Sequence, residues 1–182
     1  VNLDGKHAVA RRQHVLTDFR RVVIDGFEDF TSGYTFKGFA GAEYVIGGVF
    51  YALLSQSAVA AAVESQLVLD ALRRSSKALT AASEGELGEY LSGLSPDALK
   101  GLAANVKGIY HELLYVHNYN ATHSDTHAEV FGATNHPGAD IQIRDAESGQ
   151  VVDQIQLKAV MEAANVEAHL NKYPDIPVLA TN

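Results

Sequence analysis

The chain has 182 residues, of which 47% are hydrophobic and 20% charged, and its formal net charge is -8. This composition is typical of a folded globular protein with a real core, and it excludes a fibrous or disordered chain. Cysteine is absent, which excludes disulfides and thiolate metal sites. The negative charge argues against broad nonspecific binding to polyanions, although a bound divalent cation reverses the field around itself. The first residue is valine, which is typical of a processed product or of a piece of a longer protein.

Residues 1–94 are predicted to form a helical leader region. Apolar residues recur at helical spacing from His7 to about Phe30, and a loop rich in glycine and aromatic residues follows over Thr31–Gly41. Shorter helical segments are expected up to Arg74 and over Ser83–Leu94. The first helix carries four basic side chains, which form either a solvated face or a face that contacts phosphates: Arg11, Arg12, Arg20 and Arg21.

The stretch from Tyr44 to Val63 contains no charged residue. Its length is close to the roughly 20 residues of a membrane-spanning helix. However, Gly47-Gly48 interrupts the stretch, and the polar run Ser55-Gln56-Ser57 lies within it. We therefore expect one buried helix or two packed helices here, with insertion into a membrane as the alternative.

Residues 95–182 are predicted to form an α/β layer. Ser95, Pro96 and Asp97 are the residues expected at the start of a helix. Apolar residues three and four apart then predict a long helix with one apolar stripe, which ends near Asn118-Tyr119-Asn120: Leu99, Leu102, Val106, Ile109, Leu113 and Val116.

Short strands and a second helix are predicted after this long helix. A strand is expected over Ala128–Gly132, and two more pair around a turn at Asp145–Gln150. A helix over Val160–Tyr173 and a buried strand over Ile176–Ala180 complete the chain. The fold class is therefore α+β: a helical N-terminal region, then a helix, a three-strand meander, a helix and a strand.

The register of the two strands around that turn gathers polar side chains on one face. If Asp140 lies opposite Gln156, then Gln142 lies opposite Gln154 and Lys158 shares their face. The isoleucines and the leucine of both strands then face the core, and a slip by one residue would bury the polar set instead. Glu112 lies at the margin of the long helix's apolar stripe, where a carboxylate leans over the sheet. We therefore expect Glu112, Asp140, Gln156 and Lys158 to cluster.

Such a cluster suits hydrolysis of phosphodiester bonds with a hard cation. Mg²⁺ prefers carboxylate, carbonyl and water oxygens and leaves room for a substrate phosphate. Asp140 would be the bridging ligand, Glu112 a second or water-mediated ligand, and Gln156 would offer its amide oxygen or its backbone carbonyl. Lys158 would orient the attacking water and neutralise charge that grows on the phosphorus centre. Taken singly, each of these residues is as readily explained as a solvated surface side chain.

The pattern Gly108-xxx-Glu112, His136-Pro137-Gly138-Ala139-Asp140 and Gln156-Leu157-Lys158 resembles the PD-(D/E)XK, or restriction-endonuclease-like, superfamily. The resemblance covers about Pro96 to Thr181, and its core order is helix, three strands, helix, strand. It implies an endonuclease that uses Mg²⁺ or Mn²⁺, with DNA as the expected substrate. Gln156 stands where most members have Asp or Glu, which removes a negative charge from the site.

Many domains of this superfamily are the toxic part of bacterial polymorphic toxins or secreted effectors, and a helical leader before the nuclease resembles that arrangement. The resemblance thus implies a bacterial cytoplasmic protein or one delivered into a target cell, with a cognate immunity or inhibitor protein as a further partner.

Other chemistries are weighed against this interpretation. His123-xxx-His127 has the spacing of zinc ligands on a helix, although His111-Glu112 lacks the second histidine of a metalloprotease motif. Neither a GxSxG elbow, nor a GxxxxGK[ST] phosphate loop, nor a cysteine nucleophile is present. Two alternatives outside enzymology are a noncatalytic interaction module on a nuclease-like fold and a membrane-active helical protein.

Overall fold

A computed structural model describes residues 40–132, 138–158 and 163–180. The predicted helix over His7–Phe30 with its four arginines, and His136-Pro137 of the motif, lie outside the described residues. The chain divides into two compact units, Val1–Lys107 and Gly108–Asn182. This division falls inside helix α6 (Pro96–Thr122), whereas the sequence places the border before Ser95. The predicted domain organisation stays a prediction.

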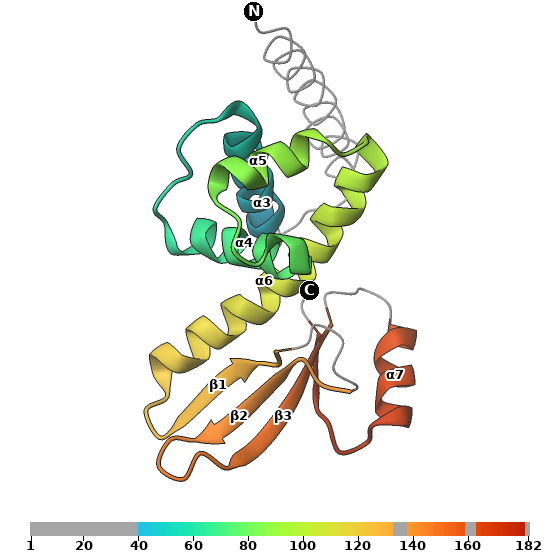
Figure 1. Ribbon diagram of the computed structural model, residues 1–182. Coiled ribbons are helices and arrows are strands. Elements are labelled where there is room, and N and C mark those ends of the chain that lie inside the picture. Colours follow the sequence, from blue (N-terminus) through green and yellow to red (C-terminus); the bar gives the residue numbers. More distant parts are fainter. Residues whose placement is uncertain (1–39, 133–137, 159–162, 181–182) are drawn as a thin grey trace, which may run out of the picture. The chain divides into compact units, whose positions relative to one another are not determined.

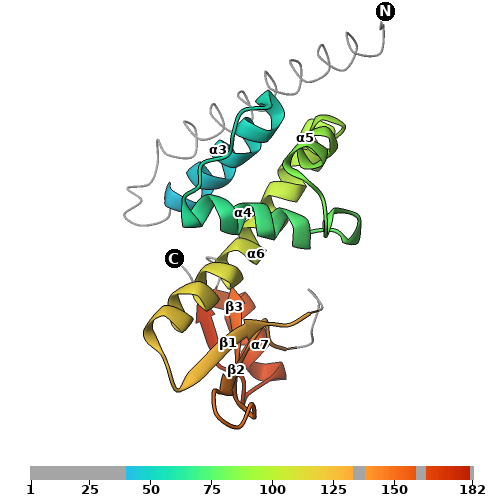
Figure 2. The same cartoon turned by 60° about the vertical axis from the view of Figure 1, so that its left-hand side comes forward.

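The first unit is built from short helices that pack through leucine and phenylalanine side chains. They are α3 (Ala40–Ser55), α4 (Val63–Arg74), the 3₁₀ helix η2 (Lys77–Leu79) and α5 (Glu84–Ser92), followed by the first part of α6 (Figures 1 and 2). The largest side chains that are fully buried in this unit come from α3, α4 and α5: Phe50, Leu54, Leu69, Leu72, Leu87 and Leu91.

Local sequence determines where these helices begin. Ser83 and Glu86 form a capping box, in which the Ser83 hydroxyl accepts from the Glu86 N–H and the Glu86 carboxylate accepts from the Ser83 N–H. Ser95 accepts from the Ala98 N–H at 3.3 Å, so α6 begins at Pro96 as its sequence predicts. The uncharged stretch is divided, because α3 ends at Ser55 and α4 starts at Val63. In the described parts of the chain, no helix is both long and apolar enough to cross a membrane.

Gly88 marks the closest approach between α5 and α3. A Cβ atom at Gly88 would lie 2.5 Å from the carbonyl oxygen of Leu53 and 3.2 Å from its carbonyl carbon. Because both atoms belong to the backbone, neither can swing away as the end of a side chain can. The packing of the first unit therefore requires glycine at this position.

We predict that Gly88→Ala lowers the free energy of unfolding by about 1–3 kcal/mol, since the added methyl group forces two helices apart. Urea unfolding followed by circular dichroism measures the change. Gly48→Ala is the matched control, because Gly48 lies in α3 and a Cβ atom added to it would meet no other part of the described residues within 4 Å. Alanine there raises stability by about 0.5–1 kcal/mol. Equal effects at both positions would contradict the close contact.

The second unit holds a four-stranded sheet in the order β1-β2-β3-β4. Its strands are β1 (Thr126–Val130), β2 (Ile141–Asp145), β3 (Val151–Lys158) and β4 (Val178–Ala180), and helix α7 (Ala163–Lys172) joins β3 to β4. β1, β2 and β3 are antiparallel neighbours, whereas β4 lies parallel to β3 (Figure 1). This mixed sheet with its helices confirms the predicted α+β class.

The register of the central hairpin is the predicted one. Gln142 lies opposite Gln154, and Ile141 lies opposite Ile155. The turn between these strands closes through a 2.9 Å hydrogen bond from the Asp145 N–H to the Gln150 carbonyl, and Gly149 takes a positive φ of 69° within it. The face with the isoleucines is the core of the unit. Its buried members are Ala128, Ile141, Ile143 and Ile155, and Tyr115, Val116 and Tyr119 of α6 pack on it.

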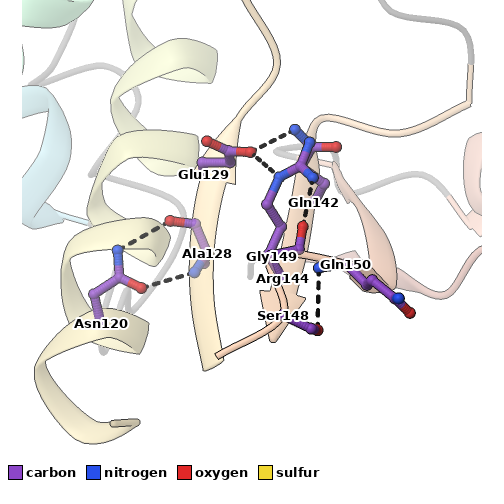
Figure 3. A network of polar contacts seen from close by, with 8 residues as sticks. All are labelled: Asn120, Ala128, Glu129, Gln142, Arg144, Ser148, Gly149 and Gln150. Carbon is purple, nitrogen blue, oxygen red and sulfur yellow. Dashed lines mark hydrogen bonds and ion pairs between the residues drawn. The ribbon is translucent and has the colours of Figure 1, made fainter. Parts of the chain in front are cut away.

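Asn120 joins α6 to β1, the strand at the edge of the sheet. Its side-chain amide donates to the Ala128 carbonyl at 3.0 Å, and its amide oxygen accepts from the Ala128 N–H at 2.8 Å (Figure 3). These bonds satisfy two backbone groups that an edge strand otherwise leaves open to another chain. They also fix the height of α6 along the sheet.

Candidate functional site

Asp140 lies where the hydrogen-bond ladder between β2 and β3 ends. Its N–H donates to the Ile155 carbonyl at 3.0 Å, beside the last pair of the ladder, in which Ile141 lies opposite Ile155. The next N–H on this side of β3 belongs to Leu157, and it donates to Asp140 Oδ2 at 2.9 Å instead of to a backbone carbonyl. The carboxylate thus takes the place of a strand residue at this end of the sheet.

Gln156 makes a second contact with the same carboxylate oxygen. Its Nε2 donates to Asp140 Oδ2 and also, at 3.0 Å, to the Leu157 carbonyl. The Gln156 side chain is almost fully buried, so this amide is held firmly. In the described residues, both hydrogen bonds to the Asp140 carboxylate end at Oδ2, which leaves Oδ1 for a ligand.

Burial raises the pKa of Asp140 above its ordinary value. The Leu157 N–H, the Lys158 ammonium, His169 and the Gln156 amide each lower that pKa, but together they do not offset the loss of hydration. Asp140 is therefore an under-compensated carboxylate, which is the electrostatic environment that favours binding of a cation.

His169 of α7 is a member of this cluster that was not among the residues predicted from sequence. It interacts electrostatically with both Asp140 and Lys158, and it is 8% exposed. Burial lowers the pKa of His169, and the Lys158 charge lowers it further, so the imidazole is neutral at pH 7. Helical spacing is the sequence signal that could have identified His169. Val166, His169 and Tyr173 are three and four residues apart and lie on the less exposed side of the segment around α7.

The structure thus brings together three of the four predicted residues, Asp140, Gln156 and Lys158. Glu112 lies on α6 and is partly buried. The α6 side chains one and two turns further on pack on the isoleucine face, which is opposite the face of Gln156. The place of Glu112 in the cluster therefore stays a prediction.

Figure 3 shows a second polar network, around Gln142. Gln142 lies opposite Gln154, so this network is on the same face of the sheet as Gln156. Gln142 Nε2 donates to Glu129 Oε1 at 2.6 Å, and the Arg144 guanidinium pairs with the same oxygen and donates to the Gly149 carbonyl at 2.9 Å. Arg144 lowers the pKa of Glu129, which therefore stays ionised and neutralised by its partner. Glu129 is thus held within the sheet by Arg144 and Gln142.

The zinc hypothesis at His123 and His127 is wrong in its geometry. Helix α6 ends at Thr122 and β1 starts at Thr126, so the two histidines do not share a helical turn. The His123 ring stacks on Tyr119 with centroids 3.9 Å apart. In residues 40–132, 138–158 and 163–180, no three side chains of His, Cys, Asp or Glu are grouped so as to hold a metal ion. A cation at Asp140 would therefore take its other donors from amides, waters or substrate.

Comparison of the chain with models of protein families, with curated proteins and with solved structures finds no match. The site's geometry therefore has to carry the functional argument.

We predict that Asp140→Asn raises the melting temperature at pH 7 in the presence of a chelator. The raised pKa means that the folded protein binds a proton more tightly than the unfolded chain, so ionisation of Asp140 lowers stability as pH rises. Asparagine avoids this cost and still accepts from the Leu157 N–H. The gain disappears by about pH 4, the ordinary pKa of aspartate, because below it the carboxyl is protonated in both the folded protein and the unfolded chain. Thermal melts at both pH values measure it.

Asp145→Asn is the control of opposite sign. Ser148 donates to the Asp145 carboxylate from its N–H at 2.7 Å and from its hydroxyl at 2.6 Å, and these bonds lower the pKa of Asp145. The asparagine variant at this position loses stability at pH 7. A lower melting temperature for Asp140→Asn at pH 7 would show that the carboxylate has a purely structural role.

Proposed function

We propose that the chain is a metal-dependent endonuclease that hydrolyses phosphodiester bonds, with DNA as its substrate. The observation that carries this proposal is the convergence of Asp140, Gln156 and Lys158 on neighbouring strands at one end of the sheet. A carboxylate that is partly buried beside a lysine has the charges needed to hold a cation and a phosphate together.

The arrangement of the second unit supports the resemblance to the restriction-endonuclease-like superfamily. Its elements follow the order α6, β1, β2, β3, α7, β4, and the first three strands form an antiparallel meander. Asp140 precedes β2, and Gln156 and Lys158 lie near the end of β3. These are the positions that the resemblance implies for the acid and for the Gln-x-Lys pair.

The donor set fits a divalent cation. Asp140 would hold Mg²⁺ or Mn²⁺ through its carboxylate, Gln156 would contribute its amide oxygen, and Glu112 would bind directly or through water. For Gln156 this requires a turn of the amide by about 180°, because Nε2 now faces Asp140. When bound, the metal supplies Lewis-acid activation of the phosphate and of a water.

The chain's own residues provide the remaining chemistry. Lys158 stands close enough to Asp140 to affect its pKa, so an ammonium is available beside any phosphate that approaches this carboxylate. There it orients the attacking water and neutralises the charge that grows on the phosphoryl oxygens. Asp140 is held in place by the Leu157 N–H, which spares the active geometry from reorganisation during the reaction.

The wider role that follows from the resemblance is that of a toxin or effector domain. The net charge of -8 suits a basic cognate inhibitor better than an acidic one. Delivery into a target cell and neutralisation by such an inhibitor form part of the same proposal.

A noncatalytic interaction module on a nuclease-like fold is the second candidate. The hydrogen bond from Gln156 Nε2 to Asp140 favours it, because this bond closes the site without a cation. The two candidates differ in one measurable property, since only the first requires a divalent metal for an effect on nucleic acid.

We predict that the purified chain nicks plasmid DNA with Mg²⁺ or Mn²⁺ and that a chelator stops the reaction. Asp140→Asn and Lys158→Ala each lower the rate by about 100-fold or more, because each removes a charge that stabilises the transition state. Gel analysis of plasmid forms over time measures these rates, and a parallel RNA substrate tests the preference for DNA.

Matched controls come from exposed residues of the same types, Asp153→Asn in β3 and Lys100→Ala in α6, which keep wild-type rates. Wild-type cleavage by the Asp140 variant would refute the assignment. DNA binding without cleavage under any metal would favour the interaction module.

We also predict that Gln156→Glu strengthens Mn²⁺ binding, as measured by calorimetric titration, since a second carboxylate then faces the cation. Without metal the same variant has a lower melting temperature, because two carboxylates repel each other where an amide now donates. Weaker Mn²⁺ binding by this variant would show that Gln156 is not a ligand.

A further inference from the structure

His169 contains a buried nitrogen that no protein group satisfies. Its side chain is 8% exposed, and Nε2 is fully buried with no hydrogen-bond partner among the described residues. Most buried polar atoms in native proteins are paired, and an exception calls for an explanation such as an ion or ligand. If the His169 imidazole only filled space, an apolar side chain could replace it with no loss of stability.

The surroundings of His169 connect it to the Asp140 cluster. Asp140 and Lys158 both act on its charge, so the ring lies within electrostatic reach of the carboxylate. Aromatic packing keeps it there, because the Tyr173 ring lies 5.1 Å from the His169 ring. Tyr173 in turn packs against Gly138, where an added Cβ would be 2.9 Å from Tyr173 Cδ1. Gly138, two residues before Asp140, and Tyr173, just after α7, are thus tightly packed together.

The candidate metal ligands around Asp140 carry one negative charge fewer than a site with a carboxylate in place of Gln156. Gln156 supplies a neutral amide where a carboxylate would add charge. In the described part of the chain no third acidic or histidine side chain is grouped with Asp140 and His169, so Glu112 would take part through water. A neutral imidazole nitrogen is a good donor to Zn²⁺ and other divalent transition metals, whereas Mg²⁺ prefers oxygen.

We propose that His169 Nε2 is a ligand of the cation that Asp140 binds, so that the site takes a divalent transition metal in preference to Mg²⁺. This inference rests on the metal site of the proposed function, but it concerns which metal the site selects and which residue selects it. It makes α7 part of the metal site and gives the unpaired nitrogen a partner.

Pulsed electron paramagnetic resonance of the full chain with Mn²⁺ tests the ligand directly. A histidine ligand gives a ¹⁴N coupling to the manganese, and we expect this coupling in the wild type and its loss in His169→Gln. In calorimetric titrations, His169→Gln weakens Mn²⁺ binding by about tenfold or more, while Mg²⁺ binding changes far less.

His127→Gln is the matched control, since it removes an exposed histidine from the same sheet and keeps the coupling. A wild-type spectrum with bound Mn²⁺ and no ¹⁴N coupling overturns the proposal, whether or not His169→Gln folds. A coupling that persists in folded His169→Gln overturns it too.

The outcomes also separate this inference from the proposed function. Mn²⁺ binding through His169 without cleavage of any nucleic acid would refute the nuclease and leave the ligand assignment intact. Cleavage with Mg²⁺ by a protein whose Mn²⁺ spectrum lacks the coupling would refute the ligand assignment alone.

Discussion

The hydrogen bond from the Leu157 N–H to the Asp140 carboxylate is the contact on which the site depends. A side chain here replaces a backbone carbonyl at the end of a strand ladder. This hydrogen bond holds the carboxylate as firmly as a strand residue is held, because many hydrogen bonds of the sheet together fix the position of Leu157. It also places the acid between β2 and β3, so a partly buried charge becomes part of the sheet itself. Burial of this charge lowers the stability of the folded state, which is why the pKa of Asp140 is raised. A group that lowers stability is retained most readily where function requires it.

Alternation along the strands made most of this site predictable from sequence. Isoleucines at 141, 143 and 155 have to face one core, and this requirement, together with the length of the turn at residues 145–150, sets Gln142 opposite Gln154. The same alternation puts Asp140 and Gln156 on one face, where their side chains meet. The helix starts at Ser83 and Ser95 were equally predictable from sequence, because capping depends on residues within one turn of each other.

Contacts between distant segments were not predictable in this way. His169 joins the cluster through long-range packing, in which Tyr173 lies against both the His169 ring and Gly138, and no local pattern states which surface a helix will cover. The pair of Glu129 and Arg144 likewise depends on which strand becomes the neighbour of β2. Sequence spacing is misleading at His123 and His127, because four residues imply a shared face only within a helix, and α6 ends at Thr122, before both of them.

Charge balance at the site connects these observations to the proposed chemistry. Asp140 contributes one negative charge and Lys158 one positive charge, while Gln156 and a neutral His169 contribute none. Glu112 adds one more negative charge in the proposed site. A divalent cation added to this set leaves an excess of positive charge, which the protein alone does not compensate. A phosphate group supplies the missing negative charge and takes up open coordination positions. Under the proposed function, substitution of a carboxylate by Gln156 therefore couples metal affinity to the presence of nucleic acid. The free protein then holds its cation weakly, and the complete catalytic site assembles only around a substrate phosphate.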